Sequence, residues 1–95
     1  MQVYTKNIKF VVNPRGDKET KCFLRVSKKV GNAVARNRIK RLLRICFIEN
    51  VNSLPKGNEY IICCGKSVDA NKSQIEQDFA SFLRKMQKEQ YVGEL

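Results

Sequence analysis

The segment from Lys28 to Arg44 constrains the fold of this 95-residue chain more than any other stretch. It reads KKVGNAVARNRIKRLLR, with seven Lys or Arg and no acidic residue, and its apolar residues recur at the three- and four-residue spacing of a helix. No Asp or Glu lies between positions 21 and 48, so nothing within that stretch neutralises the charge. The pattern predicts a helix with one buried side and one cationic side, whose natural partner is a polyanion.

Charge is distributed unevenly along the chain, whose formal net charge is +10. Residues 1–50 hold thirteen Lys or Arg against three acidic residues, whereas residues 51–95 hold six of each sign. A run of charge is often only a solvated surface. Here that alternative is disfavoured, because like charges at helical spacing repel one another by a few tenths of a kcal/mol per pair with nothing to compensate them.

The predicted helix separates into two faces when residues are placed about 100° apart. One compact arc is apolar and is expected to face a sheet: Ile39, Leu42, Leu43 and Cys46. A continuous polar face contains Asn37, Lys40, Arg41 and Arg44. Arg36 lies at the boundary between the two faces, and Arg38 lies at the far edge. With Arg36, the cations of this face are four long donors, which suit phosphate oxygens, and Asn37 adds a group that can donate and accept.

The order of the remaining elements predicts an α+β fold in one domain, residues 1–95. A turn-rich cluster at 13–17 suggests a hairpin between the first two strands. Asn32 is a candidate helix cap. The predicted elements are strands at 8–12, 21–27 and 59–65 and helices at 32–52 and 71–90. In the second strand, Phe23 and Arg25 alternate with Cys22, Leu24 and Val26, so the two sets point to opposite sides.

Composition argues against several classes of protein. No apolar run is long enough to span a membrane, and the N-terminus has charges where a signal peptide needs an apolar stretch, so a cytoplasmic location is expected. The four cysteines form no CxxC pair and the chain has no histidine, so no metal site is predicted and reduced thiols should pack as small hydrophobes. Scattered acidic residues without histidine predict no catalytic residue in the chain itself.

One segment resembles a known family. Residues 27–44 read SKKVGNAVARNRIKRLLR and closely resemble the signature of the bacterial ribonuclease P protein subunit, whose hallmark is the triplet found here as Arg36-Asn37-Arg38. Weaker similarity extends to residues 10–12, 59–66 and the last helix. The resemblance implies a small sheet resembling the second domain of ribosomal protein S5, with a left-handed strand–helix–strand crossover. General rules would predict a right-handed crossover in roughly 98% of cases.

The resemblance also implies a function. In that family a catalytic RNA, using Mg2+ held mainly by the RNA, cleaves precursor tRNA at its 5′ end. The protein assists as a component of the endoribonuclease by binding the catalytic RNA and the 5′ leader of the substrate, in a cleft between sheet and helix. By position, the RNA-binding residues would be Lys28, Lys29, Arg36, Asn37, Arg38, Lys40, Arg41 and Arg44. The leader cleft would include Phe10 and Lys66, and Phe10 could equally be a core aromatic.

The chain departs from the family pattern in ways that concern the leader more than the catalytic RNA. The family's basic N-terminal helix has no counterpart in the sequence. Cys64-Gly65-Lys66 stands where the family commonly has Ala-Arg-Lys. Asn13 occupies a position that is often aromatic, and Phe23 one that is often glycine.

Two alternative functions share the charge and size of this chain. A ribosomal-type RNA-binding protein without a role in catalysis is the stronger one. Binding of double-stranded DNA is disfavoured, because no second short helix is placed for a helix-turn-helix.

Overall fold

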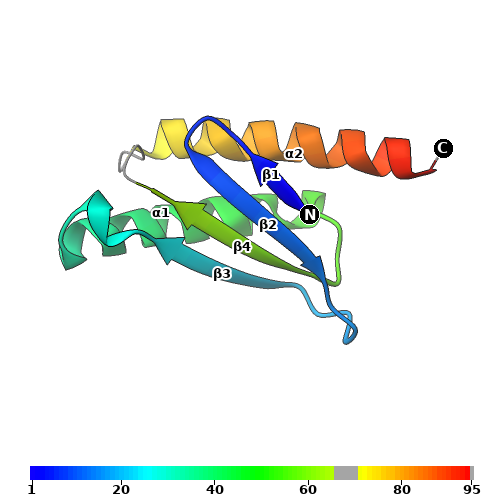
Figure 1. Ribbon diagram of the computed structural model, residues 1–95, viewed down its shortest axis with the longest axis horizontal. Coiled ribbons are helices and arrows are strands. Elements are labelled where there is room, and N and C mark those ends of the chain that lie inside the picture. Colours follow the sequence, from blue (N-terminus) through cyan, green and yellow to red (C-terminus); the bar gives the residue numbers. More distant parts are fainter. Residues whose placement is uncertain (66–70, 95) are drawn as a thin grey trace.

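The computed structural model describes residues 1–65 and 71–94 and, in the last helix, side chains up to residue 87. It is an α+β fold, as predicted: one four-stranded sheet and two α-helices (Figure 1). In chain order the elements are β1 (Gln2–Tyr4), β2 (Ile8–Pro14), β3 (Lys21–Val26), η1 (Lys28–Val30), α1 (Ala33–Asn50), η2 (Val51–Ser53), β4 (Asn58–Cys64) and α2 (Lys72–Glu94).

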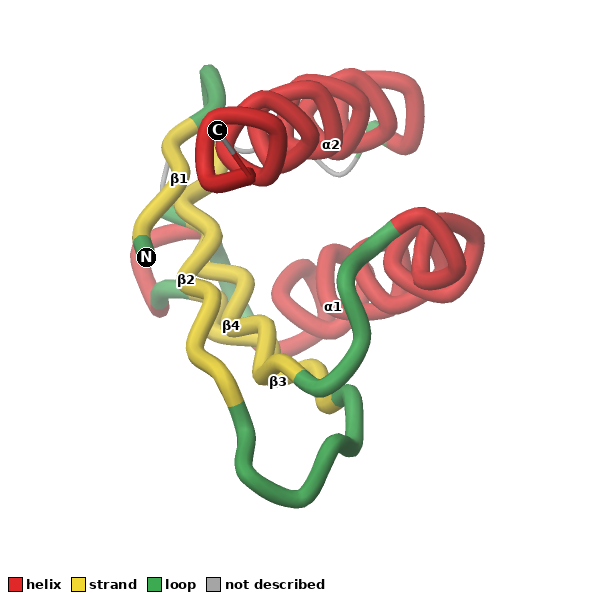
Figure 2. The backbone as a smooth tube through the Cα atoms, turned by 90° about the vertical axis from the view of Figure 1, so that its right-hand side faces the viewer, coloured by secondary structure: helices red, strands yellow, loops and turns green. Residues whose placement is uncertain are grey.

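Both helices lie on one face of the sheet (Figure 2). Alternating residues of the strands point toward them, and β2 contributes Ile8, Phe10 and Val12, which are all buried. The ring of Phe10 stacks on Phe82 of α2 at a centroid distance of 4.0 Å and meets Phe79 edge-on at 5.3 Å. Aromatic pairs of this kind contribute about 0.5–1.5 kcal/mol beyond the burial of their area. This cluster therefore fixes α2 to the middle of the sheet.

Helix α1 begins where the sequence predicts. The Asn32 side chain accepts a hydrogen bond from the backbone N–H of Ala35 at 2.9 Å, which satisfies one of the free donors of the first turn. The buried residues of α1 are Ile39, Leu43, Cys46 and Phe47. Leu42 is only partly buried against the same core. The apolar arc is thus confirmed for Ile39, Leu43 and Cys46; Leu42, at its predicted edge, is less buried, and Phe47 extends the arc on the other side.

The predicted hairpin between β2 and β3 is wrong. The strand order is β1-β2-β4-β3, so β4 lies between them, antiparallel to β2 and parallel to β3. The apolar run Tyr60-Ile61-Ile62-Cys63-Cys64 suits a central strand better than an edge position. The cluster of turn residues does form a turn at residues 16–17. The loop that follows it passes the end of β4, so β3 lies on the far side of that strand. The short edge strand β1 was not predicted.

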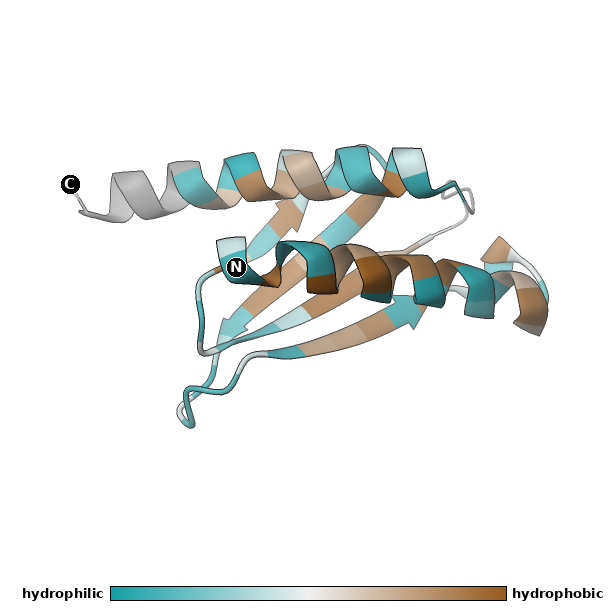
Figure 3. Cartoon of the chain, turned by 180° about the vertical axis from the view of Figure 1, so that it is seen from behind, coloured by the Kyte–Doolittle hydropathy of each residue, from teal (hydrophilic) through white to brown (hydrophobic). Residues whose placement is uncertain are grey.

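The connection from β3 through α1 to β4 is left-handed, which confirms the expectation from the resemblance. Helix α1 lies behind the sheet in Figure 1 and nearest the viewer in Figure 3. If Figure 3 is turned so that β3 and β4 run upward, β4 lies to the left of β3. A right-handed connection would put α1 on the opposite face. The left-handed one lets both helices share one core, and no helix of the described residues covers the other face of the sheet.

A buried carboxylate ties the first turn of the chain to α2. Asp78 is 4% exposed, and its two oxygens accept hydrogen bonds from the backbone N–H and the side-chain amide of Asn7, at 3.3 and 3.2 Å. Burying a carboxylate is tolerated only when such donors are present. Helix α2 begins at Lys72, and the side chain of Asn71 just before it accepts a hydrogen bond from the N–H of Ser73 at 2.9 Å.

The placement of α1 predicts the effect of truncating its most buried residue. Leu43 is 0% exposed, so Leu43→Ala should lower the free energy of unfolding by about 2–5 kcal/mol, measured by chemical denaturation. The matched change Val34→Ala, at a site 72% exposed on the same helix, should stay within about 0.5 kcal/mol. Equal losses in the two variants would mean that α1 packs through a different face.

Candidate nucleic-acid interface

The first candidate surface is a stripe of polar residues along α1 and the turn before it, called here the cationic stripe. It consists of Lys28, Lys29, Arg36, Asn37, Lys40, Arg41 and Arg44. Arg36 and Lys40 are half-buried at the border of the apolar arc, and the other members are exposed. Arg38 is exposed at the far edge, as its angular position predicted. Figure 3 shows hydrophilic (teal) and hydrophobic (brown) residues alternating along α1, as expected of a helix with one polar and one apolar side.

The charges of the cationic stripe are uncompensated within the described residues. Of the side chains described, those that form ion pairs with carboxylates belong to Arg15, Lys21 and Lys72, none of which is in the stripe. Arg41 and Arg44 therefore keep their donors free for an external partner. Guanidinium groups match phosphate oxygens in a bidentate geometry, so the stripe suits a phosphate backbone.

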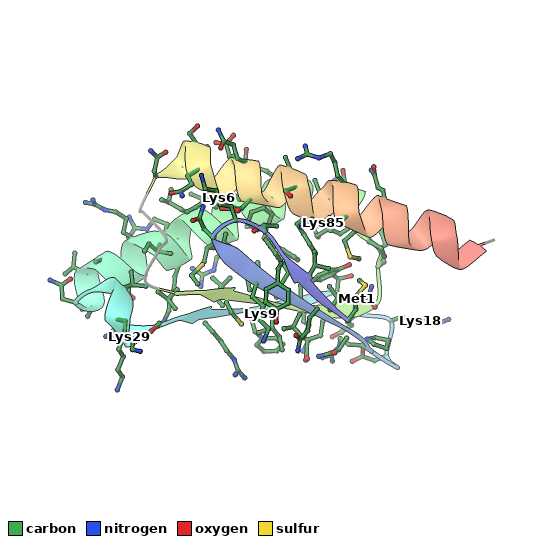
Figure 4. All side chains as sticks on the ribbon, turned by 45° about the horizontal axis from the view of Figure 1, so that its top comes forward. Met1, Lys6, Lys9, Lys18, Lys29 and Lys85 are labelled. Carbon is green, nitrogen blue, oxygen red and sulfur yellow. The ribbon has the colours of Figure 1, made fainter. Side chains whose placement is uncertain are left out.

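A local turn brings the two lysines to the start of α1. The Ser27 side chain accepts a hydrogen bond from the N–H of Lys29 at 3.1 Å and so begins η1. Gly31 follows with φ +156°, and a Cβ there would meet the Cβ of Ala35 at 3.1 Å. A side chain at this position would be strained, so glycine permits the close approach of η1 to α1. Figure 4 shows Lys29 beside this end of the helix.

The second candidate surface is the uncovered face of the sheet, called here the open face, which faces the viewer in Figure 1. The strand register arranges its side chains in rows across the sheet. One row begins with Gln2 on β1 and continues with three apolar residues, Val11, Ile61 and Phe23. The next contains Tyr4, Lys9, Cys63 and Arg25. The third contains Asn13, Glu59 and Lys21.

The two ends of the open face differ in charge: the end near the β2–β3 loop is largely neutral, and the opposite end is cationic. Arg15 lies 3.7 Å from a Glu59 oxygen, and it also hydrogen-bonds Asp17. That hydrogen bond is the main cause that lowers the pKa of Asp17 to about 2. The acidic groups near the β2–β3 loop are thus largely matched by Arg15. At the other end, Lys9 and Arg25 flank Cys63, and β3 leads directly into Lys28. Figure 4 labels Lys9 over the strands.

Of the two residues predicted for a leader cleft, Phe10 is not available. It is 1% exposed, on the face covered by the helices, so the alternative interpretation as a core aromatic is confirmed and its placement in the cleft is wrong. Period-two alternation puts Phe10 with Ile8 and Val12, and all three fill the core. Lys66 lies outside the described residues. Two aromatics that were not predicted as site residues, Tyr4 and Phe23, are 57% and 46% exposed on the open face.

The cysteines behave as packing residues. All four are free, and burial is the main cause that raises the pKa of Cys22 and Cys46 to about 11 and that of Cys64 to about 12. The thiols of Cys22, Cys46 and Cys64 therefore stay protonated at neutral pH. Within residues 1–65 and 71–94, no group of three or more His, Cys, Asp or Glu side chains could hold a metal ion. Among the described helices, none is both long and apolar enough to cross a membrane.

Comparison with known proteins gives one consistent result. Residues 1–87 match the family model described as Ribonuclease P. The ribonuclease P protein component of Geobacillus kaustophilus is 36% identical over 85 residues, which cover 85% of this chain and 70% of that protein. Among solved structures, the ribonuclease P protein of Staphylococcus aureus aligns with a TM-score of 0.78 at 23% identity, covering 88% of this chain and 78% of that one. That of Thermotoga maritima aligns with a TM-score of 0.76 at 21% identity, covering 90% and 82%.

The cationic stripe predicts a steep dependence of binding on salt. If about six of its cations contact phosphates, the affinity for a structured RNA should fall by about three orders of magnitude between 50 and 200 mM salt. Arg41→Ala should weaken binding and reduce the slope of log K against log salt by about one. Lys56→Ala, at an exposed lysine in the loop before β4, is the matched control and should leave the slope unchanged. Identical slopes for both variants would place the phosphates elsewhere.

The raised thiol pKa values predict slow alkylation. Iodoacetamide reacts with the thiolate, which for Cys46 and Cys64 appears only as the pH rises toward about 11 to 12. At pH 8.5 both thiols should stay unmodified in the folded protein, as judged by peptide mass spectrometry, and should react once guanidinium chloride unfolds it. Equal rates in both states would contradict their burial.

Proposed function

The chain belongs to the ribonuclease P protein family, and we propose that it acts as the protein subunit that binds the catalytic RNA and the 5′ leader of precursor tRNA during maturation of the tRNA 5′ end. The observation that carries the proposal is the cationic stripe: a helix whose apolar side is buried while its cations, among the described residues, lack acidic partners. Such a surface is expensive to maintain without a polyanion.

Binding of the catalytic RNA is assigned to the stripe. Arg41 and Arg44 are exposed and lie one turn apart along the helix, so both can reach one backbone of a folded RNA. Lys28 and Lys29 extend the positive potential beyond the N-terminus of α1. The half-buried stems of Arg36 and Lys40 pack beside the apolar arc, which holds their charged ends in place at a lower entropic cost than on a free surface.

Hydrolysis is assigned to the RNA partner. A hydrolytic site needs a general base or a cluster of carboxylates for metal ions. The sequence has no histidine, and several of its carboxylates already have partners: Asp78 bonds Asn7, Asp17 and Glu59 meet Arg15, and Glu49 lies 3.8 Å from Lys72. In the part of the chain that the structure describes, no group of three or more His, Cys, Asp or Glu side chains suits a metal centre. In the proposal the Mg2+ ions are held mainly by RNA, and the protein contributes position and charge.

The leader of the substrate is assigned to the open face of the sheet. This face continues from the cationic stripe through Arg25 and the turn at Ser27. A single strand that leaves an RNA bound on the stripe can therefore cross the sheet without leaving positive potential. Lys66 remains a candidate for the same path by its position in the family pattern.

The proposal is tested by reconstitution at low magnesium. The chain is combined with a bacterial ribonuclease P RNA, and cleavage of a precursor tRNA with a 5′ leader is measured, with the protein alone and the RNA alone as controls. We expect the protein to stimulate cleavage by the RNA and to cleave nothing by itself. Tight RNA binding without stimulation would support the ribosomal-type alternative instead.

A further inference from the structure

We propose that Phe23 is a base-stacking residue: its ring, exposed on the open face and flanked by Lys21 and Arg25, holds an unpaired base of a single-stranded RNA. The inference rests on the proposed function, in which the leader crosses this face, and it names a residue of this chain that would grip that strand. No such role follows from the family pattern, in which this position is often glycine.

The ring of Phe23 is exposed on the open face. Phe23 is 46% exposed, although a phenylalanine on a sheet that has a buried face could be expected to point inward. Its neighbours along β3, Cys22 and Leu24, take the inward positions and are partly buried against the core. Phe23 is thus excluded from the core by the pleat of the strand, and nearly half of its surface stays exposed on the open face.

The ring of Phe23 lies in a band of apolar side chains. The register pairs Phe23 with Ile61, and Ile61 with Val11, so an apolar band crosses the three strands. Phe23 also lines a hollow with Leu24, Arg25, Glu59 and Ile61. Because β3 is an edge strand, the ring can be approached from the side as well as from above.

Positively charged side chains lie beside this apolar band. The adjacent row places Lys9 and Arg25 on either side of Cys63, one pleat repeat away from the band. At the end of that row the ring of the exposed Tyr4 lies 5.8 Å from the Lys9 ammonium. An apolar band next to a cationic row matches a single-stranded nucleic acid, whose bases and phosphates lie on different sides of its backbone. A duplex hides its bases and would gain nothing from the band.

The occupant that fits this surface is a single-stranded RNA. An apolar protein partner would leave Lys9 and Arg25 desolvated without counter-charges, which is costly. A polyanion neutralises them. The aromatic ring accepts any base, so the site should bind with little sequence preference.

The chain has no tryptophan, which allows a direct test of stacking. Phe23→Trp introduces one fluorophore at the proposed site, and an oligoribonucleotide without secondary structure should quench it on binding. The control is Ala80→Trp, at an exposed position on α2, which covers the opposite face of the sheet. We expect saturable quenching at position 23 and none at position 80. Equal responses at both positions, or none at position 23, would overturn the proposal.

A second measurement separates stacking from apolar contact. Phe23→Leu keeps an apolar side chain but removes the aromatic face, and Phe23→Ala removes both. If the ring stacks on a base, both variants should lower the affinity for the single strand by about tenfold, because a base–aromatic stack is worth about 1–3 kcal/mol. Each variant is assayed well below its own unfolding midpoint, so that a loss of affinity cannot come from a loss of folding. Full affinity in Phe23→Leu would overturn the stacking role.

Reconstitution distinguishes this inference from the proposed function. With the catalytic RNA, Phe23→Ala should raise the KM for a precursor with a leader of several nucleotides and should leave unchanged the KM for a precursor with a one-nucleotide leader. Stimulation by the wild type together with an unchanged KM in the variant would overturn the role of Phe23 and leave the proposed function standing. If the wild type fails to stimulate, the proposed function fails, and the quenching experiment still decides whether Phe23 stacks on RNA.

Discussion

The structure depends on the burial of one side of α1 in spite of the charge on the other. Seven cations within residues 28–44 repel one another by a few tenths of a kcal/mol per close pair. Burial of Ile39, Leu43 and Phe47 contributes roughly 1.5–3 kcal/mol for each side chain, so packing outweighs the repulsion. An isolated peptide of this sequence would lack that contribution, and its helix would be marginal. The sheet therefore makes the cationic stripe possible.

The left-handed crossover has a consequence for the surface as well as for the core. It places α1 on the side of the sheet that α2 also covers, so the inward residues of β2 and β4 serve both helices. The opposite side of the sheet is then left to residues of intermediate or high exposure. Because β3 leads through Ser27 into η1 and α1, the open face and the cationic stripe are joined along the chain. Two different kinds of RNA contact can thus be held at a fixed distance by one rigid core.

Local patterns predicted local structure well. The cap at Asn32, the apolar arc around Leu43 and the alternation of Phe23 with Leu24 each depend on residues a few positions apart, and all three are confirmed. The hairpin failed because β2 pairs with β4, more than forty residues away, and turn residues do not encode such a partner. Phe10 was misplaced for a related reason. Alternation tells which residues share a side of a strand, but only tertiary packing decides which side the helices cover.

The departures from the family pattern become intelligible on the open face. Asn13 stands where the family often has an aromatic, and its amide lies 3.5 Å from Glu59, in the row nearest the β2–β3 loop. Phe23 lies two strands away, in the neighbouring row. By the family pattern, this chain thus has an amide at one point of the surface and an aromatic ring at another. Stacking requires a π-face beside positive charge and does not depend on which strand supplies it. The chemistry of a single-strand site can accordingly persist while the residue that performs it moves across the sheet.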